Sequence, residues 1–182
     1  MIVTQHNLLE VIMAFSMLTR IIVESVTDLT PEMLSDRGIE LLMLDFDNTI
    51  VPYATDFPEP LMEQWIYDMK QSAIKLCIVS NSTNQRVPIF CKNYGLDCIT
   101  HAKKPFPKGI RECLDRYGIP ASEAALIGDQ IYTDTLGANG AGVTSILVDA
   151  INNHNFWLKA RHVLELPFIF AARKRRMNHE ES

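Results

Sequence analysis

The chain has 182 residues, of which 47% are hydrophobic and 21% are charged, and its formal net charge is −5. This length suits one domain, and the apolar fraction excludes a wholly disordered chain. A mildly acidic chain has no global basic field, so we expect no nucleic-acid partner. The apolar stretch 11–23 is broken by Thr19 and Arg20, which makes it too short for a membrane span. No lysine or arginine precedes Arg20, whereas a secretory signal would carry one, so we expect a soluble cytoplasmic protein.

The cysteines and histidines do not form a recognisable metal or disulfide pattern. The four cysteines are Cys77, Cys91, Cys98 and Cys113. They form no CxxC pair, so we interpret them as small buried thiols in a reducing compartment; a disulfide or a zinc site is the alternative. The five histidines are scattered and form no HExxH motif, so we expect no histidine-based metal site.

Two helices are predicted at the start of the chain. Apolar residues recur at helical spacing over 6–26, with Glu10, Arg20 and Glu24 on the opposite side, which is typical of an amphipathic helix. Thr30 and Pro31 then match an N-cap and a first helical residue, and the short helix that they begin is expected to stop at Gly38. These helices form an N-terminal extension, 1–38.

From residue 39 onward, predicted strands alternate with predicted helices. The strands are expected at 39–44, 74–79, 97–100, 124–127 and 144–148, and the helices at 61–73, 84–94, 108–117 and 133–139. Strands that are apolar throughout indicate an α/β fold in which helices cover both faces of a parallel sheet. The chain 1–182 is then a single domain, with its core at 39–150 and a C-terminal extension at 151–182.

Chemically active side chains follow four of these strands. They are Asp45 and Asp47, then Ser80 and Asn81, then Lys104, and finally Asp129 with Asp134 shortly beyond it. Ligands of an open parallel sheet bind outside the carboxyl ends of its strands. The fold therefore brings carboxylates, a hydroxyl and an ammonium group to one rim of the sheet.

Asp45 and Asp47 are two residues apart, so their side chains face the same side of an extended chain. One carboxylate of such a pair can attack an electrophile while its neighbour handles the proton of the leaving group. The alternative interpretation is a pair of solvated turn acids that cap the next element.

Asp129 adds a third acid to this rim. Clustered carboxylates repel one another unless a cation compensates them, and oxygen donors without cysteine or histidine suit Mg²⁺. Magnesium favours phosphate substrates, whose charge Lys104 can neutralise, although Lys103 next to it leaves the choice of lysine open. Ser80 can donate a hydrogen bond to a phosphoryl oxygen, but serine is also common where strands end in turns.

Taken together, four segments resemble the signature motifs of the haloacid dehalogenase (HAD) superfamily. They are 45–49 (DFDNT), the serine in 79–81 (VSN), Lys104 before Pro105, and 128–134 (GDQIYTD). More narrowly, the chain resembles the YqeG-like phosphatases of subfamily IIIA in the segments 29–38, 102–107 (AKKPFP) and 128–139. This resemblance covers roughly residues 28–150 and implies a HAD-like, Rossmann-like sheet.

The resemblance also implies catalytic roles. Asp45 would attack phosphorus and carry an aspartyl-phosphate intermediate, while Asp47 would protonate the leaving oxygen and then activate water. Ser80, with Asn81 beside it, would bind the phosphoryl oxygens, and Lys104 would stabilise their charge. Dehalogenases of this superfamily lack the second aspartate, so Asp47 favours phosphoester hydrolysis.

The resemblance further implies a magnesium site. Asp45, Asp129 and the main-chain carbonyl of Asp47 would hold Mg²⁺. Asp134 would orient Lys104 or a metal-bound water from outside that ligand set.

The two intervals that carry cap domains in this superfamily are short in this chain. The interval 47–61 is a proline-bearing loop, and 82–103 accommodates one helix and one strand, so neither has room for a folded insertion. We therefore expect a capless enzyme with an open site, which suits a large substrate or one presented from a surface.

Phosphatases of the membrane lipid phosphatidylglycerophosphate belong to this family's neighbourhood, so a lipid phosphate is the leading specific substrate. The apolar face of the first helix and the segment 168–176 (FIFAARKRR) suit peripheral contact with an anionic membrane surface. Packing of that helix on its own sheet and a solvated basic tail are the alternatives.

Other functions stay open beside this one. The substrate could instead be a soluble phosphometabolite or a phosphoprotein. A third hypothesis is a non-catalytic binding protein on the same fold. The third is disfavoured because the proposed nucleophile and metal ligands are all present. The glycines at 137–142 follow GxxGxG rather than GxGxxG, which disfavours dinucleotide binding. The residues indicate neither an oligomeric state nor a protein partner.

Overall fold

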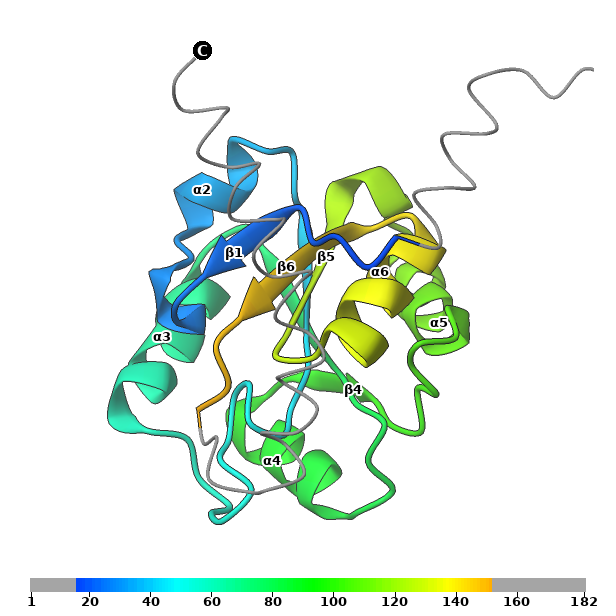
Figure 1. Cartoon of the computed structure of the whole chain (residues 1–182). Helices are drawn as coiled ribbons and strands as arrows, with labels where there is room; N and C mark the ends of the chain where they lie inside the picture. The colour runs from blue at the N-terminus through cyan, green and yellow to red at the C-terminus, as the bar shows by residue number, and fades with distance from the viewer. Residues whose placement is uncertain (1–15, 152–182) are drawn as a thin grey trace, which may run out of the picture.

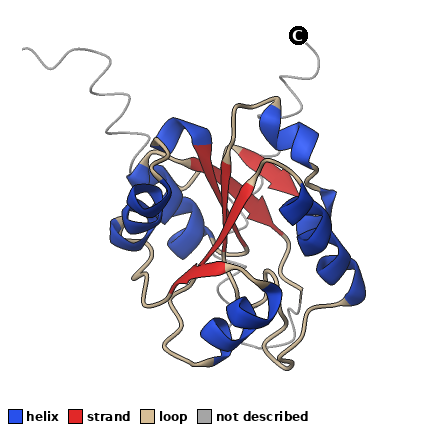
Figure 2. Ribbon diagram, turned by 180° about the vertical axis from the view of Figure 1, so that it is seen from behind, coloured by secondary structure: helices blue, strands red, loops and turns tan. Residues whose placement is uncertain are grey.

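The computed structural model describes residues 16–151, which form a sheet covered by helices on both faces (Figure 1 and Figure 2). The strands are β1 (Ile21–Val23), β2 (Leu41–Leu44), β3 (Lys75–Val79), β4 (Asp97–Ile99), β5 (Ala124–Gly128) and β6 (Thr144–Val148). The helices are α2 (Pro31–Ser35), α3 (Pro60–Gln71), α4 (Arg86–Tyr94), α5 (Lys108–Tyr117) and α6 (Leu136–Ala141), with shorter helical turns η1 (Val26–Asp28), η2 (Ala121–Glu123) and η3 (Ile131–Thr135).

The six strands lie in the order β1-β6-β5-β2-β3-β4, and every neighbouring pair is parallel. All carboxyl ends therefore point to one edge of the sheet. The expected parallel sheet is confirmed, and its two central strands are β5 and β2.

Strand β2 divides the core in two because alternate side chains of a strand face opposite sides. Leu42 and Leu44 lie in a buried cluster that includes residues of α3 and α4. Leu41 and Met43 lie in a second cluster that includes residues of α5. All four side chains are fully buried, which explains why this strand is apolar throughout.

The remaining expected elements are confirmed within a few residues. Helix α5 and strand β6 have the predicted bounds, and Gly95 and Gly118 end α4 and α5 in the left-handed region, with φ of 60° and 65°. Thr30 caps α2, since its Oγ1 accepts a hydrogen bond from the backbone N–H of Met33 at 3.3 Å. The predicted helix at 133–139 is divided between η3 and α6.

The predicted helix over 6–26 is wrong in its second half. Residues 21–23 form the edge strand β1, which pairs with β6, while residues 1–15 lie outside the described part of the chain. The run Ile-Ile-Val is β-branched and favours a strand, and a network around Ser145 attaches the residues before it to the sheet. The backbone N–H of Arg20 donates to the Ser145 carbonyl at 3.2 Å and to its hydroxyl at 3.1 Å. Tertiary pairing thus overrides the helical periodicity.

Both intervals that can carry a cap are short in the described residues. Residues 45–59 form the loop between β2 and α3, and the chain between β3 and Lys104 contains only α4 and β4. The expected capless arrangement is confirmed. The predicted C-terminal extension with its basic segment lies outside residues 16–151, apart from its first residue. Among the described helices, none has the length and apolar character needed to cross a bilayer.

We predict that Ser145→Ala destabilises the protein by about 1–3 kcal/mol, because a buried polar group that loses its partner keeps its desolvation cost. Besides accepting from Arg20, the fully buried Ser145 hydroxyl donates to Oδ1 of Asn139 at 3.1 Å. Urea unfolding measures the change, with the exposed Ser35→Ala as control. Equal stability of the two variants would contradict this account of how β1 is held.

Candidate active site

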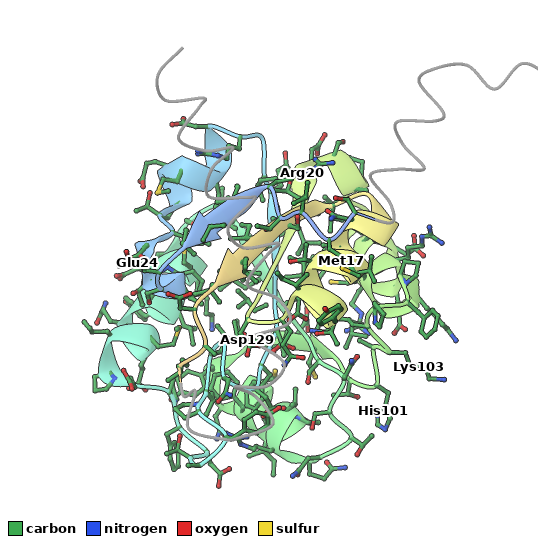
Figure 3. The ribbon with its side chains drawn as sticks, viewed as in Figure 1. Met17, Arg20, Glu24, His101, Lys103 and Asp129 are labelled. Atoms are coloured by element: carbon green, nitrogen blue, oxygen red, sulfur yellow. The ribbon has the colours of Figure 1, made fainter. Side chains whose placement is uncertain are left out.

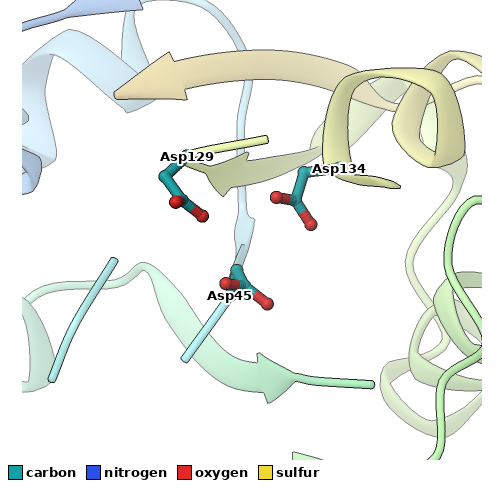
Figure 4. A group of neighbouring side chains, drawn as sticks. All are labelled: Asp45, Asp129 and Asp134. Carbon is teal, nitrogen blue, oxygen red and sulfur yellow. The ribbon is translucent and has the colours of Figure 1, made fainter. Parts of the chain in front are cut away.

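Asp45 and Asp129 directly follow β2 and β5, the two central strands, so they lie at the same edge of the sheet. Asp134 comes from η3 and joins them. Figure 4 shows the three side chains turned toward a common space, and Figure 3 shows Asp129 in the context of the whole fold. One carboxylate oxygen from each of the three lies within 4.8 Å of the others. The structure therefore brings together the acids that the strand-end argument placed at one rim.

The absence of a side chain at Gly128 makes room for Asp134. A Cβ at Gly128 would lie 2.4 Å from Cγ and Oδ2 of Asp134, far inside van der Waals contact. Oδ2 of Asp134 also accepts a hydrogen bond from the backbone N–H of Gln130 at 3.1 Å. The end of β5 and the turn η3 thus fix this carboxylate from two sides.

Lys104 is the lysine of the site. Its buried Nζ lies 2.6 Å from Oδ1 of Asp45 and 2.7 Å from Oδ1 of Asp134. Burial alone lowers the pKa of this ammonium, but the two carboxylates more than offset that effect and hold the pKa above its ordinary value. Lys103, in contrast, is exposed and points outward (Figure 3). The structure thereby decides between the two adjacent lysines.

Asn81 and Ser80 support the same edge. The Asn81 amide binds the Lys104 backbone twice, because its Nδ2 donates to the Lys104 carbonyl at 2.8 Å and its Oδ1 accepts from the Lys104 N–H at 2.7 Å. The buried Ser80 hydroxyl accepts from the backbone N–H of Ser82 at 3.0 Å. Within residues 16–151 no group accepts the Ser80 hydroxyl proton, so this hydroxyl is able to donate to a bound anion.

Asp47 contacts a residue that the sequence analysis missed, Arg86. Nη1 of Arg86 lies 2.8 Å from Oδ1 of Asp47. Burial raises the pKa of the Asp47 carboxyl, although the guanidinium opposes this shift. Arg86 lies at the start of a helix, where no motif spacing distinguishes it from a surface arginine, so the sequence carried no signal for this pair.

Thr49 lies between two of the acids. Its Oγ1 is 3.4 Å from Oδ2 of Asp45 and 3.5 Å from Oδ1 of Asp129. Thr49 and Asp45 are both buried. Thr49 therefore helps to hold the two carboxylates at a fixed separation.

The cluster is rich in carboxylates. The Lys104 ammonium lies against Asp45 and Asp134, Asp129 lies close to both of these acids, and Asp47 pairs with Arg86. Burial raises the pKa of Asp134 to about 6, which still leaves it mainly ionised at neutral pH. Three neighbouring carboxylates form a set of oxygen donors that matches a hard divalent cation.

Comparison with known proteins agrees with this geometry. Residues 101–159 match the model of the HAD-hydrolase-like family. The chain is 34% identical over 126 residues to "Probable phosphatase YqeG" of Bacillus subtilis, and this match covers 69% of this chain and 73% of that protein. It is also 36% identical over 44 residues to a glyceraldehyde 3-phosphate phosphatase of Pyrococcus abyssi, a match that covers 24% of this chain and 18% of that protein.

Two solved structures share the fold. A hypothetical protein from Xanthomonas campestris has a TM-score of 0.54 at 14% identity, covering 76% of this chain and 79% of its own. The cobalt-bound deoxy-D-mannose-octulosonate 8-phosphate phosphatase from Haemophilus influenzae has a TM-score of 0.50 at 12% identity, covering 69% and 75%. With the sequence match to YqeG, these findings establish that the chain belongs to the HAD-like hydrolases, as a YqeG-like phosphatase.

Proposed function

We propose that this protein is a Mg²⁺-dependent phosphomonoester hydrolase that acts through an aspartyl-phosphate on Asp45. The observation that carries the proposal is the position of the Lys104 ammonium, buried between Asp45 and Asp134. It holds the Asp45 carboxylate, the proposed nucleophile, in place and puts positive charge where a transferring phosphoryl group gathers negative charge.

In the first step, a carboxylate oxygen of Asp45 forms a bond to phosphorus. The bond from phosphorus to the leaving oxygen breaks, its electron pair passes to that oxygen, and the carboxyl group of Asp47 supplies a proton. The Ser80 hydroxyl and the Lys104 ammonium bind the phosphoryl oxygens. The raised pKa of Asp47 supports its role as the acid.

In the second step, Asp47 takes a proton from a water molecule while the water oxygen attacks phosphorus. The bond between phosphorus and Asp45 breaks, and its electron pair returns to the carboxylate. Inorganic phosphate leaves, and the proton taken from water returns Asp47 to its starting protonated state while Asp45 is again a free carboxylate. Asn81 holds the Lys104 backbone during both steps, and we propose that its amide binds a phosphoryl oxygen together with Ser80.

The residues suit a bound magnesium ion. Asp45, Asp129 and the main-chain carbonyl of Asp47 would hold Mg²⁺, which when bound supplies charge neutralisation to the phosphoryl oxygens. The proximity of three carboxylates, with one oxygen of each within 4.8 Å of the others, supports this assignment. Asp134 is engaged by Lys104 and by the Gln130 N–H, which supports a role in positioning Lys104 rather than in binding the ion directly.

For the substrate we propose a phosphate carried by a lipid at the cytoplasmic membrane surface, with phosphatidylglycerophosphate as the first candidate. The open, capless edge admits a headgroup that stays in its membrane. The loop that follows Asp47 carries two exposed aromatic side chains, Tyr53 and Phe57, which suit contact with an apolar phase. A soluble phosphometabolite or a phosphoprotein is the alternative, and the local similarity to a glyceraldehyde 3-phosphate phosphatase favours the metabolite.

We predict that Asp45→Asn abolishes turnover of p-nitrophenyl phosphate while the fold survives, because an amide cannot attack phosphorus. Acid quenching with a labelled substrate is expected to trap a phosphoprotein from the wild-type chain and none from the variant. The exposed Asp115→Asn is the matched control. Unchanged turnover in Asp45→Asn, with circular dichroism showing a native fold, would remove Asp45 from the mechanism.

Chelation is expected to stop the reaction. Treatment with excess EDTA followed by dialysis leaves the carboxylate cluster without its cation, so turnover falls to background, and added Mg²⁺ restores it whereas Na⁺ at equal ionic strength does not. Asp129→Asn is expected to raise the Mg²⁺ concentration needed for half-maximal activity. Full activity in excess chelator would contradict the metal assignment.

We predict that the purified full-length chain floats with vesicles that contain anionic lipid at low salt, and that it hydrolyses phosphatidylglycerophosphate in those vesicles faster than a phosphopeptide or soluble sugar phosphates. The electrostatic part of the binding weakens as salt is added. Absence of flotation at low salt, or a preference for a soluble ester, would contradict the lipid proposal and leave the hydrolase mechanism intact.

A further inference from the structure

The side chain of Arg86 links the proposed catalytic acid to the loop that follows it. Nη1 binds Oδ1 of Asp47 at 2.8 Å, and Nε lies 3.1 Å from Oδ1 of Asp56. Nη2 donates to the backbone carbonyls of Pro52, at 2.5 Å, and Thr55. Both terminal nitrogens of one planar guanidinium thus donate hydrogen bonds in different directions, while Nε contributes an ion pair without a hydrogen bond.

The guanidinium is itself held in place. Its Cζ lies over the ring of Phe46 at 5.1 Å from the centroid, and Phe46, which is fully buried, packs edge-on against Phe90 of the same helix at 5.1 Å between centroids. The backbone N–H of Arg86 is bound by Oδ1 of Asn84 at 3.1 Å. Helix α4 and the core residue between the two motif aspartates therefore fix the position of Arg86.

The pairing is asymmetric with respect to the carboxyl group of Asp47. Arg86 occupies Oδ1, whereas Oδ2 has no hydrogen-bond partner within residues 16–151, and the Asp47 side chain is 20% exposed. A carboxyl group that is held by one oxygen presents the other in a defined direction. A proton on Oδ2 is then already positioned for transfer to the leaving oxygen, and the Asp47 side chain need not change its rotamer first.

We infer that Arg86 is the positioning residue for the acid step, holding Asp47 by Oδ1 so that Oδ2 delivers its proton to the leaving group and later takes one from water. This inference rests on the proposed function. Arg86 does not contact the transferring phosphoryl group in it; the effect passes through Asp47. The contacts to the 52–56 segment give Arg86 a structural task as well, so the test has to separate the two tasks.

The test compares two esters that differ in their need for a proton. The p-nitrophenolate ion leaves readily without one, whereas the more basic phenolate of phenyl phosphate depends on an acid. For Arg86→Ala we expect kcat/KM for phenyl phosphate to fall about 10²-fold, the low end of what a positioned general acid contributes, and that for p-nitrophenyl phosphate to fall clearly less. The value of kcat/KM reflects the steps up to and including departure of the leaving group. It therefore reports on the acid step even when a later step limits kcat.

Three further measurements sharpen this test. Arg86→Lys keeps the charge without the planar fork and is expected to show the same selective loss to a smaller extent. Added guanidinium ion is expected to restore phenyl phosphate turnover in Arg86→Ala more than p-nitrophenyl phosphate turnover. Arg111→Ala, which removes an exposed arginine of α5, serves as the control and should leave both esters unchanged.

The outcomes separate this inference from the proposed function. Equal losses for both esters in Arg86→Ala and Arg86→Lys, or no loss for either, would overturn the positioning role while the hydrolase itself stands. Should Arg86→Ala fail to fold by circular dichroism, the ratio of the two esters in Arg86→Lys decides the question alone. Absence of wild-type turnover for both esters would overturn the proposed function and this inference with it.

Discussion

The buried contact of the Lys104 ammonium with Asp45 and Asp134 is the interaction on which the rest of the site depends. A charge removed from water costs several kcal/mol even after relaxation, and only close, well-directed partners offset that cost. The carboxylates at 2.6 and 2.7 Å provide this compensation. Because the three residues come from different strand ends, the same contact ties the loop after β4 to the ends of β2 and β5.

Several local features hold Lys104, Asp45 and Asp134 in this contact. Gly128 leaves the space that the Asp134 carboxylate occupies, the Asn81 amide fixes the backbone of Lys104 from both sides, and the turn η3 directs Asp134 inward instead of along the helix. This task requires no contact with a substrate. Each one restricts where the buried charges lie, which is the condition for electrostatic preorganisation.

The two motif aspartates are each held by a cation of their own. Asp45 pairs with Lys104 from the β4 side of the sheet, and Asp47 pairs with Arg86 from α4. Residues only two apart in the chain therefore have separate partners, which suits the separate roles of nucleophile and acid proposed for them. Asp129 follows β5 at the same edge, and one of its carboxylate oxygens lies within 4.8 Å of oxygens of Asp45 and Asp134, an arrangement of oxygen donors that suits a divalent ion.

The sequence by itself determined the alternation of strands and helices, the parallel sheet and the polar residues that follow its strands. These depend on local rules: apolar runs, helical periodicity, and glycines such as Gly95 and Gly118 where a helix must end. Parallel strands then place their carboxyl ends at one edge, so Asp45, Asp129 and Lys104 could be expected to meet before any coordinates were known.

Only the tertiary structure decided which groups pair. Residues 21–23 were predicted as part of a helix but form a strand, because they pair with the backbone of β6. The hydrophobic periodicity of the sequence carries no information about that pairing. Lys103 and Lys104 are chemically identical in the sequence, and backbone direction alone buried one and exposed the other. Arg86 belongs to no sequence motif that could have predicted its role, because its partners Asp47 and Asp56 are distant from it in the chain. Local propensity sets the elements, whereas the direction and partner of a charged side chain follow from contacts between residues far apart in the chain.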